Sequence, residues 1–413
     1  MLKRIRTSDL RLGMYVNELC GSWMQHPFWR TRFKLTDAED IERIRASGIA
    51  EVWIDTAKGL DVEGDGGAVI TREQADGAIE RELARAIAQP QQPSPRAPID
   101  QEMARAARTF RQARPAVVAM FGEARMGRAI DAARAASLVQ EISDSVSRNP
   151  AALIGIARLK DKDEYTYMHS VAVCAPMIAL ARQLGLDDEL TRELGLAGLL
   201  HDIGKAKVPL ETLNKPSKLT DAEFAAVKSH PEHGHAILAA GGAASPISLD
   251  VCLHHHEKVD GSGYPHRLNG EAISLYAKMG AVCDVYDAIT SDRPYKNGWY
   301  PAESIRRMAE SAKDHFDETV FHAFVKTVGI YPLGSLVRME SGRLGVVVEQ
   351  SEEALLAPKV RVFFSTKWQL HIPPQTIDLA RPGTADRIVG REDPQRWGLT
   401  RVDETWAGEA ARR

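Results

Sequence analysis

The stretch His201-Asp202-Ile203-Gly204-Lys205 brings an imidazole, a carboxylate and an ammonium group together within five residues. The apolar run at residues 194–200 (LGLAGLL) leads into it and predicts a buried helix that ends at these side chains. A carboxylate at the edge of a core is tolerated when it is paired or binds a cation. Gly204 is typical of a helix C-cap, where the left-handed conformation favours glycine. The stretch therefore predicts a metal site at the end of a buried helix.

Histidine and aspartate recur along the same region, at positions where a predicted helix or turn begins or ends. The set comprises His169, His201, Asp202, His230, His255, His256 and Asp284. Imidazole and carboxylate ligands without a thiolate favour iron, manganese or zinc, and Asp202 is placed to bridge two ions. A bridged pair of metal ions activates water and clamps phosphoryl oxygens. These residues alone therefore predict phosphoester hydrolysis, with Asp202 as a catalytic residue.

Two longer motifs make the sequence recognisable. Residues 201–205 match the HD motif, and residues 255–265 (HHEKVDGSGYP) match the pattern HHExxDGxGYP. Residues 284–290 (DVYDAIT) and 293–296 (RPYK) fit the same pattern further downstream. Residues 140–332 therefore strongly resemble the HD-GYP domain, a subgroup of the HD superfamily of metal-dependent phosphohydrolases.

This resemblance implies an all-helical catalytic core and a role for each residue at a matching position. The histidines and aspartates named above fall at the family's metal-ligand positions, and Lys205 falls at that of a catalytic lysine that faces the scissile phosphate. An ammonium group there can stabilise charge that develops on a phosphoryl oxygen. Arg293 and Lys296 resemble the family's substrate-phosphate contacts, although their chemistry fits surface cations as well. Two alternatives stay open for Tyr264, which either faces the substrate or packs.

The reaction that the resemblance implies is hydrolysis of cyclic di-GMP to linear pGpG, GMP or both, by a hydroxide that bridges two metal ions. Iron or manganese is the expected cofactor. Some related domains hold a third metal with a glutamate four residues before the first ligand histidine. That position is Tyr165 here, and Glu164 points about 100° away around a helix. We therefore expect two divalent metal ions per chain.

Two other functions remain as alternatives. One is hydrolysis of another cyclic dinucleotide or nucleotide, although the GYP turn argues against the broader superfamily. The other is a non-catalytic sensor that binds metal or nucleotide and docks a signalling partner protein. A full ligand set together with Lys205 argues against a sensor, because a degenerate site has no need of both.

The elements that must position these residues are predicted as helices with apolar periodicity, separated by Gly, Pro, Asn or Asp turns. They cover residues 169–184, 187–202, 220–228, 231–240, 246–256, 273–291, 301–312 and 317–328. No strand pattern interrupts them. The expected fold class is therefore mainly α in the catalytic domain at residues 140–332.

The flanking regions have a different character. Residues 1–66 combine strand-like runs with one amphipathic helix, which predicts a small α+β domain, and they resemble an uncharacterised domain that often precedes HD-GYP domains. Residues 67–139 predict a helical connector with a proline-rich, disordered linker at residues 89–98. Residues 333–392 predict a small C-terminal β element, and residues 393–413 predict a loose tail.

The composition narrows the function classes further. A net charge of −3 over 413 residues lacks the basic excess of many nucleic-acid-binding proteins. The four cysteines lie far apart, which is typical of reduced thiols in a cytoplasmic protein. No uninterrupted apolar run approaches the ~18 residues that a membrane span needs, so we expect no membrane insertion. The helices of residues 100–148 offer a surface for a homodimer, which the sequence does not decide.

Overall fold

The computed structural model of the chain describes residues 2–20, 32–62, 70–86, 97–160, 165–217, 219–242, 244–292, 298–351 and 354–411. The chain forms two compact units, Met1–Arg85 with Arg306–Ser311 and Ala86–Ile305 with Ala312–Arg413. Helices predominate among the described residues, and each unit also holds one antiparallel sheet. The mainly α fold class is therefore confirmed. None of the described helices has both the length and the apolar character that crossing a bilayer requires.

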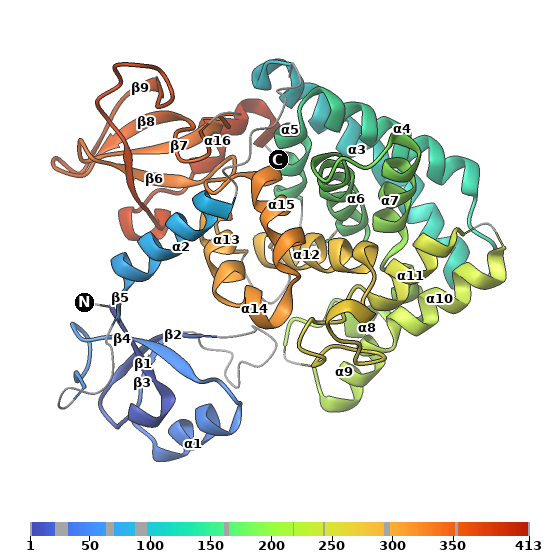
Figure 1. Cartoon of the computed structure of the whole chain (residues 1–413), viewed down its shortest axis with the longest axis horizontal. Helices are drawn as coiled ribbons and strands as arrows, with labels where there is room; N and C mark the ends of the chain where they lie inside the picture. The colour runs from blue at the N-terminus through green and yellow to red at the C-terminus, as the bar shows by residue number, and fades with distance from the viewer. Residues whose placement is uncertain are drawn as a thin grey trace. The chain divides into compact units, whose positions relative to one another are not determined.

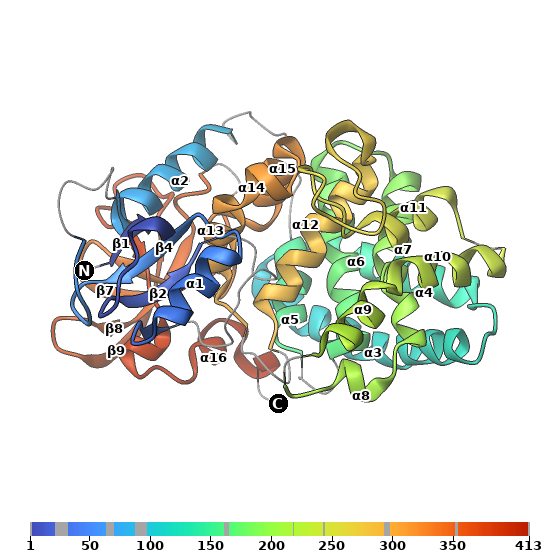
Figure 2. The same cartoon turned by 90° about the horizontal axis from the view of Figure 1, so that it is seen from below.

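The first unit is built on a five-stranded sheet of order β3-β2-β4-β1-β5 (Figure 1). Its strands are Leu2–Arg6 (β1), Tyr15–Leu19 (β2), Phe33–Lys34 (β3), Glu51–Asp55 (β4) and Ile70–Thr71 (β5). Helix α1 (Ala38–Ala46) begins at Asp37, whose carboxylate accepts the backbone N–H of Glu39 at 3.0 Å. Its residues Ile41 and Ile44 belong to one buried apolar cluster with Val52 and Ile54 of β4, and Figure 2 shows α1 beside the strands of this sheet. The predicted α+β arrangement is thus present.

Helix α2 (Arg72–Ala86) follows β5, and most of it belongs to the first compact unit, which runs to Arg85. The sequence had placed this helix in a connector that begins at residue 67. Residues 89–96, which are most of the predicted proline-rich linker, lie outside the described residues. The domain boundaries themselves stay predictions.

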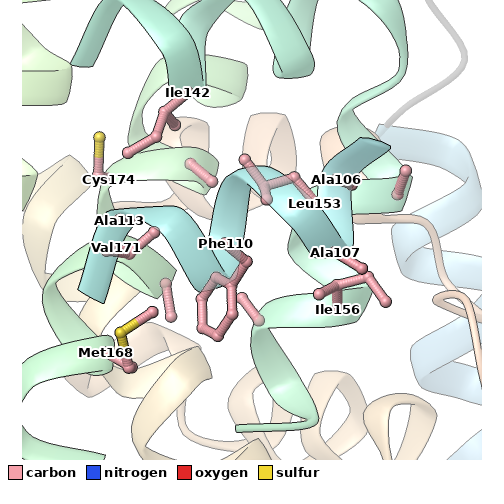
Figure 3. Packing of buried hydrophobic residues seen from close by; sticks show 14 of the residues in the cluster. Ala106, Ala107, Phe110, Ala113, Ile142, Leu153, Ile156, Met168, Val171 and Cys174 are labelled. Atoms are coloured by element: carbon pink, nitrogen blue, oxygen red, sulfur yellow. The ribbon is translucent and has the colours of Figure 1, made fainter. Parts of the chain in front are cut away.

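The second unit contains a bundle around one apolar core. Its first helices are Ile99–Arg125 (α3), Ala132–Arg148 (α4), Pro150–Arg158 (α5), Tyr165–Gln183 (α6) and Asp188–Leu200 (α7). Phe110, Ile142, Leu153 and Val171, one from each of α3 to α6, meet in this core (Figure 3). Asn149 ends α4 and caps α5 by accepting the N–H of Ala151 at 3.2 Å, which explains the sharp break between these helices.

Further helices follow along the described part of the chain, and the six that have eight or more residues fall within a few residues of their predicted positions. In chain order the helices are Leu210–Leu213 (α8), Asp221–Lys228 (α9), His230–Gly241 (α10), Pro246–His254 (α11), Leu275–Thr290 (α12), Pro301–Glu310 (α13), Ala312–His315 (α14) and Glu318–Val328 (α15). Thr220 and Glu223 form the capping box that starts α9. The short helices α8 and α14 were not predicted, because four residues are too few to show a period.

A second five-stranded antiparallel sheet follows the bundle, in the order β10-β6-β7-β8-β9. Its strands are Leu336–Met339 (β6), Arg343–Glu349 (β7), Lys359–Ser365 (β8), Leu370–Asp378 (β9) and Ile388–Arg391 (β10). Leu344 and Val346 of β7 belong to the same apolar cluster as the helices α3 to α6. The predicted C-terminal β element is therefore present, and it shares its core with the helical bundle.

The prediction of a loose tail at residues 393–413 is wrong for the part that the structure describes. A 3-10 helix at Pro394–Trp397 and helix α16 (Val402–Ala407) lead to Trp406, whose side chain is buried in the main apolar cluster. The indole N–H of Trp406 donates to Asp403 at 2.9 Å. A Cβ atom on Gly155 of α5 would lie only 3.1 Å from this indole. The described part of the tail is ordered because the large side chain of Trp406 packs closely against Gly155 of α5. Local sequence patterns do not reveal a contact between such distant segments.

Candidate metal centre

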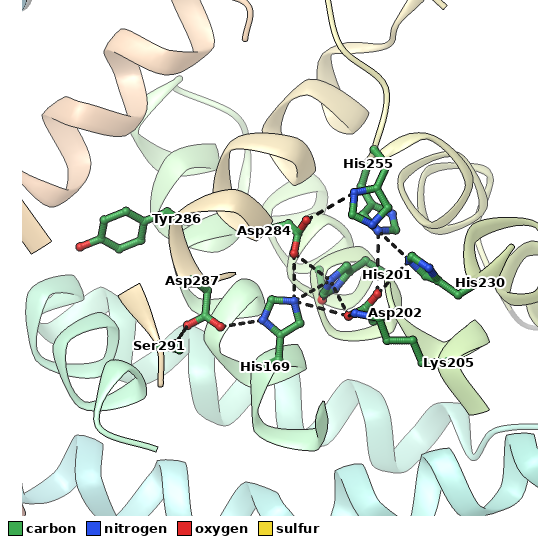
Figure 4. Close-up of polar contacts among 12 residues, drawn as sticks. His169, His201, Asp202, Lys205, His230, His255, Asp284, Tyr286, Asp287 and Ser291 are labelled. Carbon is green, nitrogen blue, oxygen red and sulfur yellow. Dashed lines mark hydrogen bonds and ion pairs between the residues drawn. The ribbon is translucent and has the colours of Figure 1, made fainter. Parts of the chain in front are cut away.

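The structure brings all the predicted metal ligands together, and Figure 4 labels each of them except His256. They come from the body of α6, the C-terminal end of α7, the first residue of α10, the end of α11 and the middle of α12. In chain order these are His169, His201 with Asp202, His230, His255 with His256, and Asp284. Most of these ligands lie at helix ends, and the others lie within helices. Their side chains therefore extend from rigid elements toward one another.

The first half of the centre is formed by His169 and His201, whose Nε2 atoms face each other at 3.3 Å. The Nδ1 atom of His201 donates to the carbonyl of Gly198 at 2.8 Å. The Nδ1 atom of His169 lies 2.6 Å from the Asp287 carboxylate. Hydrogen bonds at Nδ1 leave the Nε2 lone pairs directed at each other, which is the arrangement of imidazoles that share a cation.

The second half of the centre repeats this geometry. The Nε2 atoms of His230 and His255 lie 3.3 Å apart. Their Nδ1 atoms donate to the carbonyls of Val227 at 2.7 Å and Val251 at 3.0 Å. His256 offers a third nitrogen to this group. Backbone carbonyls therefore hold His201, His230 and His255 with their Nε2 atoms turned inward, and the Asp287 side chain does the same for His169.

Asp202 lies between the two halves and presents one oxygen to each. Its Oδ2 atom is 3.4 Å from Nε2 of both His169 and His201, and its Oδ1 atom is 3.1 Å from Nε2 of His230. Asp284 straddles the centre in the same way, with Oδ1 at 2.9 Å from His169 Nε2 and Oδ2 at 3.7 Å from His256 Nδ1. Both carboxylates can therefore bridge.

Burial keeps the imidazoles of the second set, His230, His255 and His256, in their neutral form. Burial and the neighbouring histidines lower the pKa of His255 to about 3. Burial also lowers the pKa of His230 and holds the pKa of His256 well below its usual value. Burial opposes ionisation of Asp202, but the Lys205 ammonium and His201 hold the pKa of that carboxyl well below its usual range. Neutral imidazoles beside ionised carboxylates are the forms that bind metal.

The donor set fits divalent cations on two structural observations. The buried Oδ1 atom of Asp202 has no hydrogen-bond partner among the described residues, because the nearby His230 carries its proton on the other nitrogen. Apposed lone pairs at 3.3 Å repel unless a cation or proton lies between them. Two groups of these residues, His169 with His201 and Asp202 and His230 with His255 and His256, can each hold a metal ion.

The predicted substrate contacts are placed less completely. Lys205 donates to Oδ2 of Asp202 from the rim, where its side chain keeps 18% exposure. The Tyr264 ring stacks on His256 with centroids 4.7 Å apart, so it packs on a predicted ligand. Arg293 and Lys296 lie outside the described residues, and so do Glu164 and the side chain of Tyr165. The number of metal ions therefore stays a prediction.

The C-cap role predicted for Gly204 is wrong. Gly204 lies inside a 3-10 helix, Ile203–Lys207, that follows the HD pair, and its φ angle is not positive. A Cβ atom at this position would lie 1.9 Å from the carbonyl oxygen of His230 and 2.5 Å from the backbone nitrogen of Gly234. Glycine is needed here because two backbones almost touch, and this approach sets the position of His230.

Replacing Gly204 with alanine is expected to lower the free energy of unfolding by about 1–3 kcal/mol or more, since α10 must move away, and to weaken metal binding through His230. Thermal unfolding and metal content of the purified variant measure both effects. At Gly241, near the other end of α10, an added Cβ atom would meet no neighbouring atom within 4 Å. Gly241→Ala should therefore be neutral or stabilising, and equal losses in both variants would contradict the prediction.

Sequence reasoning assigned no role to three residues that the structure places beside the centre. Asp287 binds His169. Glu257 is buried and accepts the backbone N–H groups of His266 at 2.7 Å and Leu268 at 3.0 Å, which fastens the GYP turn. Lys228 holds its ammonium 4.5 Å from the Tyr264 ring centroid. The two acidic residues stand in recognised motifs, whereas Lys228 precedes His230 by two residues and gives no distinctive signal.

Known proteins share both parts of this chain. Residues 143–320 match the HD domain family, and residues 2–135 match a domain of unknown function, DUF3391. The sequence is 57% identical over 412 residues to the cyclic di-GMP phosphodiesterase PA4108 of Pseudomonas aeruginosa, which covers 99% of this chain and 97% of that protein.

Two further relatives match only the catalytic region. Identity is 38% over 174 residues to the cyclic di-GMP phosphodiesterase response regulator RpfG of Xanthomonas campestris pv. campestris, covering 40% of this chain and 46% of that protein. It is 36% over 166 residues to the 3'3'-cGAMP-specific phosphodiesterase 1 of Vibrio cholerae, covering 40% of this chain and 38% of that protein. The chain therefore belongs to the HD-GYP group of the HD superfamily of metal-dependent phosphohydrolases, and it carries a DUF3391 domain before its HD domain.

Proposed function

We propose that the chain hydrolyses a phosphodiester bond of cyclic di-GMP, giving pGpG, GMP or both, at a centre of two divalent metal ions, iron or manganese. The observation that carries this proposal is the pair of apposed imidazole sets on either side of one buried carboxylate, Asp202. The near full-length likeness to a protein named as a cyclic di-GMP phosphodiesterase supports the substrate.

The residues that would hold the two ions form two sets, one on each side of the Asp202 carboxylate. His169 and His201 would hold one ion, and His230, His255 and His256 the other. Asp284 supplies an oxygen to each half. When bound, such a pair of ions provides an activated water and neutralises charge on the phosphoryl oxygens.

The chain's own residues supply orientation and charge around the reacting phosphate. The Lys205 ammonium lies at Asp202 and stays partly exposed, so it can approach a phosphoryl oxygen. Burial and the nearby Asp284 and Asp202 hold the pKa of Tyr264 well above its usual value, so its hydroxyl keeps a proton to donate. Arg293 and Lys296 are proposed to contact a substrate phosphate, on the resemblance of their motif alone.

Lys228 adds a further cation to this surface. Its ammonium lies over the Tyr264 ring, and it forms no ion pair with a carboxylate within the described part of the chain. Replacing Lys228 with methionine is expected to raise KM about tenfold with little change in kcat, because a hydrogen bond to a charged group contributes about 1.5 kcal/mol. Steady-state kinetics measure this. Lys215 is already paired with Glu223 at 2.6 Å, so Lys215→Met is the matched control and should keep the wild-type KM.

A panel of substrates tests the proposed reaction. Protein loaded with Mn(II) or Fe(II) is incubated with cyclic di-GMP, 3'3'-cGAMP and a nucleoside triphosphate, and the products are separated by chromatography. The proposal expects pGpG or GMP from cyclic di-GMP. Faster turnover of 3'3'-cGAMP would favour the alternative substrate, and binding of cyclic di-GMP without turnover in either metal would favour a sensor.

We propose a cytoplasmic enzyme whose DUF3391 domain receives a signal, with a homodimer or a partner protein as the means of transmitting it. The absence of a bilayer-crossing helix among the described residues is compatible with this proposal.

A further inference from the structure

The imidazole of His169 is held at both of its nitrogen atoms by a single turn of α12. Its Nε2 atom lies 2.9 Å from Oδ1 of Asp284, and its Nδ1 atom lies 2.6 Å from Oδ2 of Asp287 (Figure 4). Residues three apart on a helix share one face, so the two aspartates clamp the ring from the same helix. Only Asp284 faces the other predicted ligands, which leaves Asp287 without a part in binding the metal directly.

Asp287 is itself fixed by a buried cation. Its other oxygen, Oδ1, accepts from Nζ of Lys160 at 2.6 Å and from the hydroxyl of Ser291 at 3.1 Å. Lys160 also donates to the carbonyl of Ala157 at 3.0 Å. Lys160, Asp287 and Ser291 are all buried. A buried carboxylate persists when a paired cation and further hydrogen bonds satisfy its oxygens, and Asp287 meets both conditions.

The charge on Asp287 fixes where His169 carries its proton. An ionised carboxylate can only accept hydrogen bonds, so Nδ1 of His169 must keep a hydrogen atom to satisfy Oδ2. The lone pair needed for a metal is then on Nε2, which points at His201. We infer that Asp287 is a positioning residue whose ionised carboxylate sets the tautomer of His169 and thereby the metal affinity of the His169 and His201 half, while Lys160 stabilises the buried charge of Asp287. This inference rests on the proposed metal centre.

An asparagine at position 287 has the same shape as aspartate, but it cannot accept hydrogen bonds at both ends of its side-chain group. Its side chain offers one acceptor oxygen and one donor NH2 group, whereas Lys160 and His169 both present donors. The oxygen is expected to turn toward the charged Lys160. The NH2 group then faces Nδ1 of His169 and favours the tautomer with hydrogen on Nε2, which cannot bind metal. We expect Asp287→Asn to weaken metal binding in this half about 10- to 100-fold.

Removing the competing donor should restore binding. In the double variant Lys160→Met with Asp287→Asn, the asparagine oxygen is free to accept from His169, and its NH2 group can donate to the hydroxyl of Ser291. The single variant Lys160→Met keeps the carboxylate that accepts from His169, so it should bind metal like the wild type even if it unfolds at a lower temperature. A merely structural role for Asp287 predicts no such rescue.

Metal titration of the full chain tests the inference. Metal-free wild type and the three variants are titrated with Mn(II) by isothermal titration calorimetry, with thermal unfolding as the measure of folding. A fourth variant, Glu102→Gln, disturbs a buried glutamate that Arg148 binds at 2.8 Å outside the metal centre, and it should lose stability without losing metal.

The outcomes separate the inference from the proposed function. We expect two Mn(II) sites in the wild type, one weakened site in Asp287→Asn, and recovery to within a few-fold in the double variant. Wild-type affinity in Asp287→Asn, no recovery in the double variant, lost binding in Lys160→Met, or an equal loss in Glu102→Gln would each overturn the inference. A wild-type chain that binds no Mn(II) would instead overturn the proposed metal centre itself.

Discussion

Replacing Asp202 with asparagine is expected to reduce hydrolysis by at least about 100-fold and to lower the metal content from two ions to one or none per chain. Asp202 is the carboxylate that presents Oδ1 to His230 and Oδ2 to His169 and His201. Losing even an outer partner of a ligand costs about 10- to 100-fold, so losing a shared ligand should cost more. Elemental analysis and product chromatography measure the two effects.

Asp187 offers a matched control for this substitution. It caps the N-terminus of the same helix, α7, by accepting the N–H of Leu190 at 2.8 Å, and asparagine caps helices equally well. Asp187→Asn should therefore keep both metal ions and full activity. An Asp202→Asn protein that retained two ions and hydrolysed substrate at the wild-type rate would rule out the bridging role.

The second large effect is expected at Lys205. Lys205→Met should lower kcat about 100- to 1,000-fold, the range seen when one preorganised donor to developing charge is removed, while both metal ions stay bound. The reason is that the ammonium lies on the rim of the centre, at Oδ2 of Asp202, and belongs to neither imidazole set. Steady-state kinetics beside elemental analysis distinguish a catalytic loss from a loss of metal.

Lys207 provides the comparison for this variant, since it lies on the same 3-10 helix and is exposed. Lys207→Met removes an equal charge two residues away and should leave kcat unchanged. If Lys205→Met kept kcat within about threefold of the wild type, charge stabilisation by Lys205 would be excluded. If it lost the metal ions, its main role would be to support Asp202.

The helices of the catalytic region were predictable because their apolar periodicity is local. Helix α9, for example, covers Asp221–Lys228 where a helix over residues 220–228 was expected, and the HD and GYP motifs contain four of the residues that meet at the centre, His201, Asp202, His255 and His256. Local patterns say nothing of close approaches between distant segments. Gly204 fits a C-cap by its sequence neighbours, yet its true constraint is the carbonyl of His230.

Residues that act through another residue were not predicted, for a similar reason. The spacing of Asp284 and Asp287 is a readable signal, since both lie one turn apart on α12, but only the position of His169 shows that they hold one ring. Lys160 belongs to no recognised motif, and its role depends on Asp287, which lies 127 positions away in the sequence. In the tail, Trp406 sits in a short polar segment whose burial depends on α5 rather than on its own periodicity.

The packing of Trp406 against α5 has a consequence for how the chain is made. Arg158 at the end of α5 binds Asp403 at 2.6 Å across 245 positions of sequence, so this contact forms only after nearly all the intervening chain has been synthesised. Before Trp406 is added, the surface of α5 at Gly155 lacks the indole that covers it in the folded chain. A chain interrupted before Trp406 would carry every predicted metal ligand and still expose this surface, which favours aggregation or proteolysis. Only a chain that extends through Trp406 therefore has both the predicted metal ligands and a fully covered apolar core.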